Sequence, residues 1–133
     1  MADVNHEPAL IRLNEESAAP KYMQIAEQVR EFVATGQLLP GDQLPSVRQL
    51  ASDLGVNVNT VLAAYRALEA EEIVLVRHGS RAVVHPRFKR PARPGPGDVA
   101  EVRSLLWRVR TEALLRGMTL EALQALARDV FSE

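Results

Sequence analysis

The sequence predicts a mainly α-helical chain with one small β-hairpin, built as a winged helix-turn-helix followed by a two-helix C-terminal tail. Three observations predict this class. Two short helical patterns meet at a glycine within residues 46–66, two β-branched segments flank a turn after them, and a proline-rich stretch precedes two further amphipathic patterns. The expected parts are a disordered N-terminus at residues 1–9, the winged domain at 10–85, a linker at 86–97 and the tail at 98–133.

Composition excludes several classes of protein. The 133 residues accommodate one domain with an appendage, and no cysteine is present for a disulfide framework or a Cys-based metal site. No apolar run approaches the ~20 residues of a membrane span, and the first residues lack the basic start of a signal peptide. We therefore expect a cytoplasmic protein with no membrane partner and no cofactor.

Positive charge is concentrated in one part of the chain, although the net charge is −1. Residues 73–97 contain six lysines and arginines and no acidic residue. A local basic region is typical of nucleic-acid partners, whereas a solvated hairpin tip and a solubilising linker are the alternatives. The linker, with four prolines, is expected to be stiff and extended.

Residues 46–66 predict two helices joined by a tight turn. Ser46 can cap the first helix by accepting the Gln49 amide, and Gln49 can reach back to the Ser46 amide in a capping box. Gly55 ends that helix, and Asn57 caps the next, which continues to about Ala70. The expected inner face of the first helix is Val47, Leu50, Ala51 and Leu54, and that of the second is Val58, Val61, Leu62, Tyr65 and Leu68.

The outer face of the second helix is polar near its start. Asn59, Thr60, Ala63 and Arg66 project away from the expected inner face. Such a face suits base edges and phosphates, because asparagine can pair with adenine through two hydrogen bonds. This pattern favours a helix that enters the major groove of DNA. A helical hairpin in any small domain is the alternative interpretation.

A further helix is expected before this motif, beginning at Pro20 and ending at Gly36. Residues 10–13 precede it as a short edge strand or an extended arm. Residues 39–42, Leu-Pro-Gly-Asp, predict a turn. The apolar stripe of the helix is Tyr22, Ile25, Ala26, Val29, Phe32 and Val33.

A β-hairpin is expected after the helix-turn-helix. Residues 73–77 and 82–85 are strand-like and flank a turn at residues 78–81. Three helices and a basic hairpin make a winged helix-turn-helix. The residues expected to lie along phosphates or the minor groove are Arg77, His78, the Gly79 backbone and Arg81.

Metal and enzyme chemistry are disfavoured. His78 and His85 lie seven residues apart across a turn without nearby carboxylates, which is poor spacing for metal ligands. Solvated hairpin histidines are the favoured interpretation, and no metal is expected. The chain also lacks a cysteine nucleophile and a glycine-rich phosphate loop, so we do not expect an enzyme.

Two helices are expected in the tail. Asp98 and Glu101 form a second capping signature, Gly117 ends the first helix and Thr119 caps the other. Their apolar faces need either the winged domain or a second copy of the tail, and we favour the copy because the linker separates them from the first core. Trp107 lies off this face and is expected to serve packing. The expected dimerisation face is Val99, Val102, Leu106, Val109, Leu120, Leu123, Ala127 and Val130, flanked by Leu105, Ala113, Leu114, Leu126 and Phe131.

Four segments carry a specific pattern, namely residues 22–30, 39–51, 54–61 and 68–71. The second contains Pro-Gly-Asp-x-Leu-Pro-Ser-x-Arg-x-Leu-Ala, which is long and specific. With these segments the chain resembles the GntR family of bacterial transcriptional regulators, from about residue 10 to residue 84. The run Val-Asn-x-Asn-Thr-Val-x-x-Ala-Tyr-Arg and the short two-helix tail look most like the YtrA-type branch.

The resemblance implies DNA contacts from Arg48, from the start of the recognition helix and from the wing glycine. Two positions depart from the family pattern: Val58 stands where many members carry arginine, and Arg81 replaces the second glycine of a Gly-x-Gly wing. The arginines are expected to hold phosphates, and Asn57, Asn59 and Thr60 to specify bases. The candidate DNA-binding residues are Ser46, Arg48, Asn57, Asn59, Thr60, Arg66, Arg77, His78, Gly79 and Arg81.

The resemblance further implies a nucleoid-associated homodimer that binds a roughly palindromic double-stranded DNA operator. It implies repression, often of a nearby transport operon, with a small-molecule effector of unknown identity as a further partner. A winged-helix module that binds proteins without binding DNA is the alternative. Salt-dependent binding to duplex DNA would separate the two, because phosphate contacts release counterions.

Overall fold

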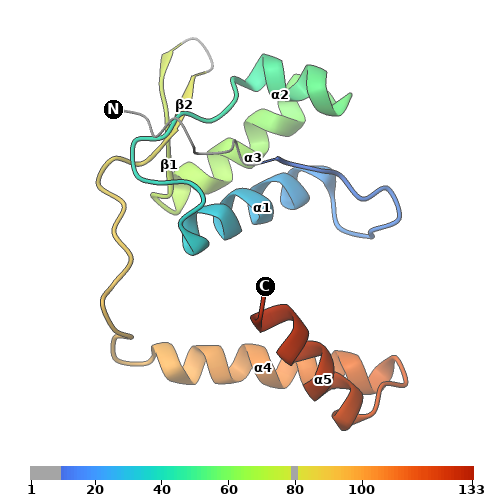
Figure 1. Ribbon diagram of the computed structural model, residues 1–133. Coiled ribbons are helices and arrows are strands. Elements are labelled where there is room, and N and C mark those ends of the chain that lie inside the picture. The colour runs from blue at the N-terminus through green and yellow to red at the C-terminus, as the bar shows by residue number, and fades with distance from the viewer. Residues whose placement is uncertain (1–9, 79–80) are drawn as a thin grey trace. The chain divides into compact units, whose positions relative to one another are not determined.

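The computed structural model describes residues 10–78 and 81–133 (Figure 1). The predicted disorder of residues 1–9 and the predicted contact at Gly79 lie outside these residues. The chain forms two compact units, and the division between them falls after residue 90. The first contains α1 (Lys21–Thr35), α2 (Val47–Leu54), α3 (Val58–Ala70), β1 (Val74–Val76) and β2 (Ala82–Val84), and the second contains α4 (Asp98–Leu115) and α5 (Leu120–Phe131).

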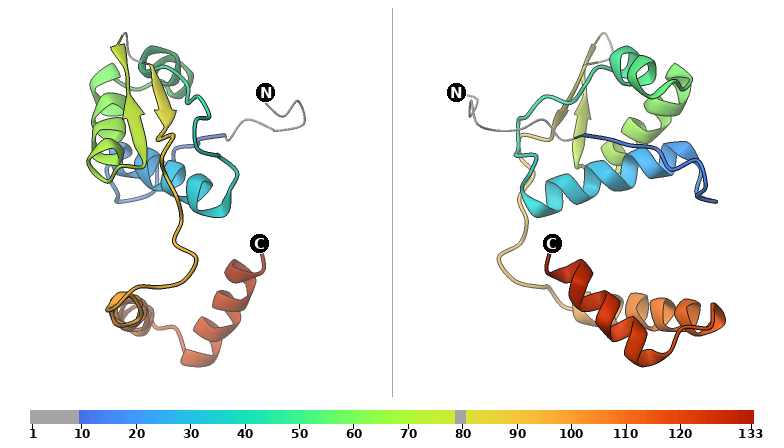
Figure 2. Two further views of the ribbon diagram at one scale, coloured as in Figure 1. Left: turned by 90° about the vertical axis from the view of Figure 1, so that its left-hand side faces the viewer. Right: turned by 45° about the vertical axis from the view of Figure 1, so that its right-hand side comes forward.

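Helix α3 is the centre of the first unit. Helices α1 and α2 pack on it, and the antiparallel β1–β2 hairpin lies beside it (Figure 2). This is the winged helix-turn-helix that the sequence predicts. Its inner face is closed to solvent at Val61, Ala64, Tyr65 and Leu68. Further fully buried side chains in the described residues are Ile25, Val29, Val47, Val74 and Val84.

The predicted helix caps of the helix-turn-helix are confirmed. Ser46 Oγ accepts the Gln49 amide at 3.1 Å, and Asn57 Oδ1 accepts the Asn59 amide at 2.8 Å. Gly55 adopts φ 67° and ψ 35°, the left-handed conformation that glycine enters at no steric cost. The predicted reciprocal bond, from the Ser46 amide to the Gln49 side chain, is wrong. Within the described residues Gln49 Nε2 donates instead to Asp53 Oδ1, one turn later, at 2.7 Å.

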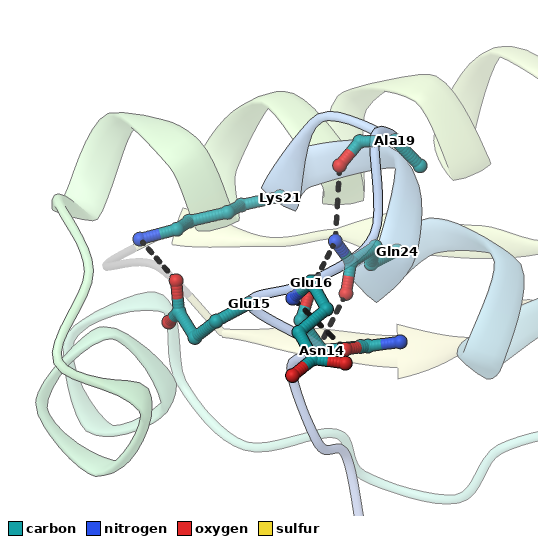
Figure 3. Close-up of polar contacts among 6 residues, drawn as sticks. All are labelled: Asn14, Glu15, Glu16, Ala19, Lys21 and Gln24. Atoms are coloured by element: carbon teal, nitrogen blue, oxygen red, sulfur yellow. Dashed lines mark hydrogen bonds and ion pairs between the residues drawn. The ribbon is translucent and has the colours of Figure 1, made fainter.

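The N-terminal arm is extended and is tied to α1 by two glutamines. The backbone of Arg12 bonds the Gln28 side chain, and the amide of Asn14 donates to Gln24 Oε1 at 2.8 Å. Gln24 Nε2 also donates to the Ala19 carbonyl at 2.9 Å (Figure 3). The arm is not a strand, so of the two predicted alternatives the extended arm is the one observed. These bonds hold Ile11 in the core.

The predicted stripe of α1 is confirmed from Ile25 to Val33, with Phe32 half-buried. The prediction that Tyr22 begins this stripe is wrong, because the residue is 40% exposed. All three residues of the segment 21–23 are exposed, so the first turn of α1 extends beyond the core. Periodicity identifies the apolar face of a helix but not where its neighbours end.

The loop before α2 is attached to the wing. The two strands are slightly shorter than predicted, with Val74 opposite Val84. The Gly41 amide donates to the Val84 carbonyl and the Leu44 amide to the Ala82 carbonyl, both at 2.9 Å. Residues 41–44 therefore run beside β2. The predicted turn at 39–42 is present, with the Asp42 amide donating to the Leu39 carbonyl at 2.9 Å.

The start of the predicted linker contacts the first unit. Phe88 packs against the core, and Arg90 Nη1 donates to the Ala34 carbonyl near the end of α1 at 3.3 Å. The linker prediction covered residues 86–97, and its first residues therefore lie on the folded unit. None of the described helices is long and apolar enough to cross a membrane.

In the second unit, α4 and α5 pack on each other and bury little of their apolar surface. Ala113 is the one buried residue among the described residues of this unit. The predicted cap of α5 is confirmed, with Thr119 Oγ1 accepting the Ala122 amide at 3.0 Å. Trp107 is exposed, with Arg110 Cζ 5.1 Å from its ring centroid, and its packing role stays a prediction.

The predicted cap at Asp98 is wrong. Gly97, with φ 86°, occupies the N-cap position of α4 without a side-chain bond. Asp98 is already helical, and its Oδ2 atom accepts the Gly95 amide at 2.6 Å. The reason is the Gly-Pro-Gly turn, because Gly97 can adopt a positive φ and so start the helix one residue earlier.

One hydrogen bond joins α3 to the loop before α2. The Tyr65 hydroxyl donates to the Pro45 carbonyl at 2.7 Å, and the tyrosine has no exposed surface. Burial raises the pKa of Tyr65 above its ordinary value, so the hydroxyl stays a neutral donor.

We expect Tyr65→Phe to lower the free energy of unfolding by about 1–2 kcal/mol, because the Pro45 carbonyl loses its partner. Urea denaturation followed by circular dichroism measures this. Tyr22→Phe is the matched control, because Tyr22 is exposed and makes no hydrogen bond within the described residues. Equal stability of the two variants would contradict the prediction.

Candidate nucleic-acid interface

The front of α3 displays the polar side chains predicted to read bases. Asn57 and Asn59 are exposed, and Thr60 is half-buried. Asn57 Oδ1 is engaged by the helix cap, which occupies one of its two acceptor positions. The Asn59 side chain makes no hydrogen bond within residues 10–78 and 81–133. Asn59 is therefore the asparagine whose donor and acceptor are both available to a base edge.

The predicted inner position of Val58 is wrong. Val58 is the first residue of α3 and is 44% exposed, whereas Val61, almost one turn later, is fully buried. As in α1, the first turn of the helix extends beyond the core. The buried stripe is completed instead by Ala64, whose small side chain allows close packing.

A groove of about 850 Å³, which we call the recognition groove, lies between α2, α3 and the end of β1. Arg48 comes from α2, Arg66 from α3, and Arg77 and His78 follow β1. The groove thus brings together four residues predicted separately along 31 positions of sequence. Its apolar lining, which sequence reasoning did not assign to a site, comprises Val47, Val58, Leu62, Leu75 and Val76.

A second hollow, of about 510 Å³, lies beside the wing and is called here the wing hollow. Ser46, Arg77 and Arg81 contribute to its lining, so Arg77 borders both hollows. The Ser46 oxygen is engaged by the helix cap, but its hydroxyl hydrogen remains able to donate to an anion. The wing and the start of α2 therefore present donors to the same space.

Most cations around the two hollows lack a carboxylate partner. In the described part of the chain, Arg48, Arg77 and Arg81 form no ion pair, and all three are exposed. Unpaired arginines at a concave surface attract anions such as phosphates. This part of the surface is therefore positively charged, although the net charge of the chain is negative.

Arg66 differs because it is paired. Its Nη1 atom lies 2.8 Å from Glu69 Oε1, one turn later on α3. Glu69 Oε2 accepts the Val76 amide of β1 at 3.0 Å. The bond from the Val76 amide, followed by the bond from Arg66, lowers the pKa of Glu69. Glu69 thus links α3, a groove arginine and the wing. Glu69 was not among the predicted site residues, although the i,i+3 spacing of Arg66 and Glu69 could have predicted their ion pair.

Within the described residues, the wing histidines His78 and His85 belong to no group of three potential metal ligands. Among residues 10–78 and 81–133, no three His, Cys, Asp or Glu side chains are grouped to hold a metal ion. His85 Nδ1 accepts the Arg87 amide at 3.1 Å, so this nitrogen serves a local turn. His78 lines the recognition groove.

An exposed polar helix front beside a cationic groove and a wing defines the DNA-binding class of winged helix-turn-helix proteins. Comparison with known proteins agrees. Residues 21–84 match the family described as "Bacterial regulatory proteins, gntR family". The transcriptional repressor YtrA of Bacillus subtilis is 31% identical over 124 residues, which cover 93% of this chain and 94% of YtrA. The chain belongs to the GntR family, and it is a DNA-binding transcriptional regulator similar to YtrA.

Solved structures support the same assignment. A protein of Listeria monocytogenes EGD-e, described as a transcriptional antiterminator, superposes with a TM-score of 0.74 at 31% identity, covering 96% of this chain and 92% of that one. YtrA from Sulfolobus acidocaldarius superposes with a TM-score of 0.57 at 40% identity, covering 76% of this chain and 97% of that one. The YtrA resemblance seen in the sequence is therefore confirmed, and these relatives are regulators rather than enzymes.

We expect Glu69→Gln to remove a pH-dependent part of the stability. The pKa of Glu69 is lower in the folded chain, so its stabilising effect is present above the unfolded-state pKa and is lost as pH falls through the folded-state pKa. The variant should be less stable than wild type near neutral pH, and the difference should shrink between about pH 5 and about pH 3.

Urea denaturation across this pH range measures the effect. Glu31→Gln is the matched control, because the Glu31 carboxylate lies exposed on α1 without a bond to any described residue. A stability difference for Glu69→Gln that does not depend on pH would contradict the assignment.

Proposed function

We propose that this regulator is a homodimeric repressor that binds a roughly palindromic operator. The observation that carries the proposal is the recognition groove, where Arg48 and Arg77, which have no ion-pair partner within the described residues, flank the exposed front of α3. Arg48, Arg77 and Arg81 hold phosphates and so set the register, with Ser46 and His78 beside them. Asn59 and Thr60 read bases, and Asn57 assists through its side-chain NH2 group. The ion pair with Glu69 orients Arg66.

The DNA-binding part comprises residues 10–85, and the tail at 98–133 supplies the dimer contacts. The apolar side chains of α4 and α5 support this, because much of their surface is open in a single chain. Six members of the predicted face are between 41% and 60% exposed, namely Val99, Val102, Leu106, Val109, Leu120 and Val130. Leu123 and Ala127 are half-buried between them. A second copy would remove this apolar surface from water.

Two-fold symmetry would place half-sites about 10 bp apart, or a multiple of that spacing. The repressor role and the transport target are supported by relatives. YtrA of Bacillus subtilis is named a repressor, and a relative 42% identical over 65 residues is named the mannosyl-D-glycerate transport/metabolism system repressor of Escherichia coli. A protein bound to this operator would lie at the nucleoid in the cytoplasm. Control of operator binding by a small-molecule effector is part of the same proposal.

Arg48→Ala should weaken binding to an operator selected from a random duplex library. Removing a phosphate contact lowers the slope of log affinity against log salt by about 0.9 per contact, so the loss should be larger at low salt. Fluorescence anisotropy at several salt concentrations measures both quantities. Arg12→Ala is the matched control, since Arg12 is an exposed arginine on the arm along α1.

Identical salt slopes for Arg48→Ala and wild type would contradict the role of Arg48. If wild type binds no duplex at any salt, the DNA-binding surface itself is refuted and the protein-interaction alternative gains support.

Leu106→Glu should convert the dimer to a monomer. Leu106 is 55% exposed in the single chain and lies centrally in the proposed face, where a buried carboxylate would be strongly unfavourable. Sedimentation velocity measures the mass, and Ser104→Glu adds the same charge at an exposed position of α4 outside the face. If Leu106→Glu sediments as a dimer, the tail is not the interface; monomeric wild type would refute the dimer itself.

A further inference from the structure

An exposed aliphatic side chain stands at the front of the recognition groove. Val58 is the first residue of α3 and is 44% exposed, although its neighbours in the groove include Arg48, Arg66 and Arg77. Leu62, one turn later on the same face, and Leu75 from β1 continue an apolar strip behind it. The strip is therefore part of the surface that would face a bound duplex.

The chemistry of DNA restricts what this strip can contact. Phosphates and most base edges are polar, and pressing them against valine would remove water without providing a hydrogen bond. The C5 methyl group of thymine is the apolar group that a base presents in the major groove. Arg48 and Arg77, which form no ion pair with the part of the chain that the structure describes, would hold the flanking phosphates while the helix front approaches the bases.

The neighbouring side chains strengthen this assignment. The Asn57 oxygen is engaged by the helix cap, so the residue before Val58 has reduced capacity to read a base edge. The side-chain amide of Asn59, immediately after Val58, makes no hydrogen bond to any of the described residues. An apolar contact therefore sits beside the main polar reader at the start of the helix, where base contacts concentrate in helix-turn-helix docking.

We propose that Val58 is a specificity-determining residue that contacts a thymine methyl group in the operator. This rests on the proposed function, since it assigns one base preference of the same DNA-binding surface. Burying one methyl group against Val58 should change affinity about fourfold per contacted thymine.

The test uses the full chain and an operator selected from a random duplex library. Each thymine is replaced in turn by uracil, which removes the methyl group and keeps the base-pairing edge. Wild type should lose about fourfold in affinity at one thymine of a half-site. Val58→Ala should bind the unmodified operator about fourfold more weakly than wild type does. Uracil at that position should not weaken its binding further.

Leu39→Ala is the matched control, because Leu39 is an exposed apolar residue of the first unit outside the groove lining, and it should retain the uracil effect. Thermal melting of Val58→Ala should match wild type, which separates lost contact from lost folding. Uracil sensitivity that persists in Val58→Ala, or a wild type that tolerates uracil at every position, overturns the proposal while leaving DNA binding intact. Failure of wild type to bind any duplex instead overturns the proposed function.

Discussion

Burial of the inner face of α3 is the constraint on which the rest of the first unit depends. Val61, Ala64, Tyr65 and Leu68 have no exposed surface, and α1, α2 and β1 all pack against this helix. The Tyr65 hydroxyl adds a directional bond to the loop before α2. Because the inner face is held this firmly, the opposite face and the first turn are presented to solvent in a defined orientation, as a base-reading helix requires.

Charge placement follows from the same scaffold. A chain of net charge −1 presents a cationic surface because its acidic groups lie elsewhere or are already engaged. Glu69 is the informative exception, since it lies beside the groove but uses both carboxylate oxygens, one on Arg66 and one on the Val76 amide. It therefore positions a groove arginine and connects the wing to α3, while Arg48 and Arg77 form no ion pair among the described residues.

Most local features could be predicted, and features that depend on distant neighbours could not. The caps at Ser46, Asn57 and Thr119 were correct because a cap involves residues two or three positions apart. Asp98 failed because a glycine conformation moved the helix start by one residue. The predictions that Tyr22 and Val58 are buried were wrong for a different reason. Both residues continue the apolar period of their helix, but they lie in its first turn, which extends beyond the core.

The sequence by itself determined the class of protein, since the helix-turn-helix spacing, the wing and the family motif are all written in contiguous residues. Tertiary structure alone decided which of these residues share a surface. Arg48 lies on α2, Arg66 lies on α3 and Arg77 follows β1, and their common groove exists only because α2, α3 and β1 pack around one core. Periodicity describes a helix relative to its own axis, whereas exposure depends on how far neighbouring elements extend, and that is a property of the packed fold.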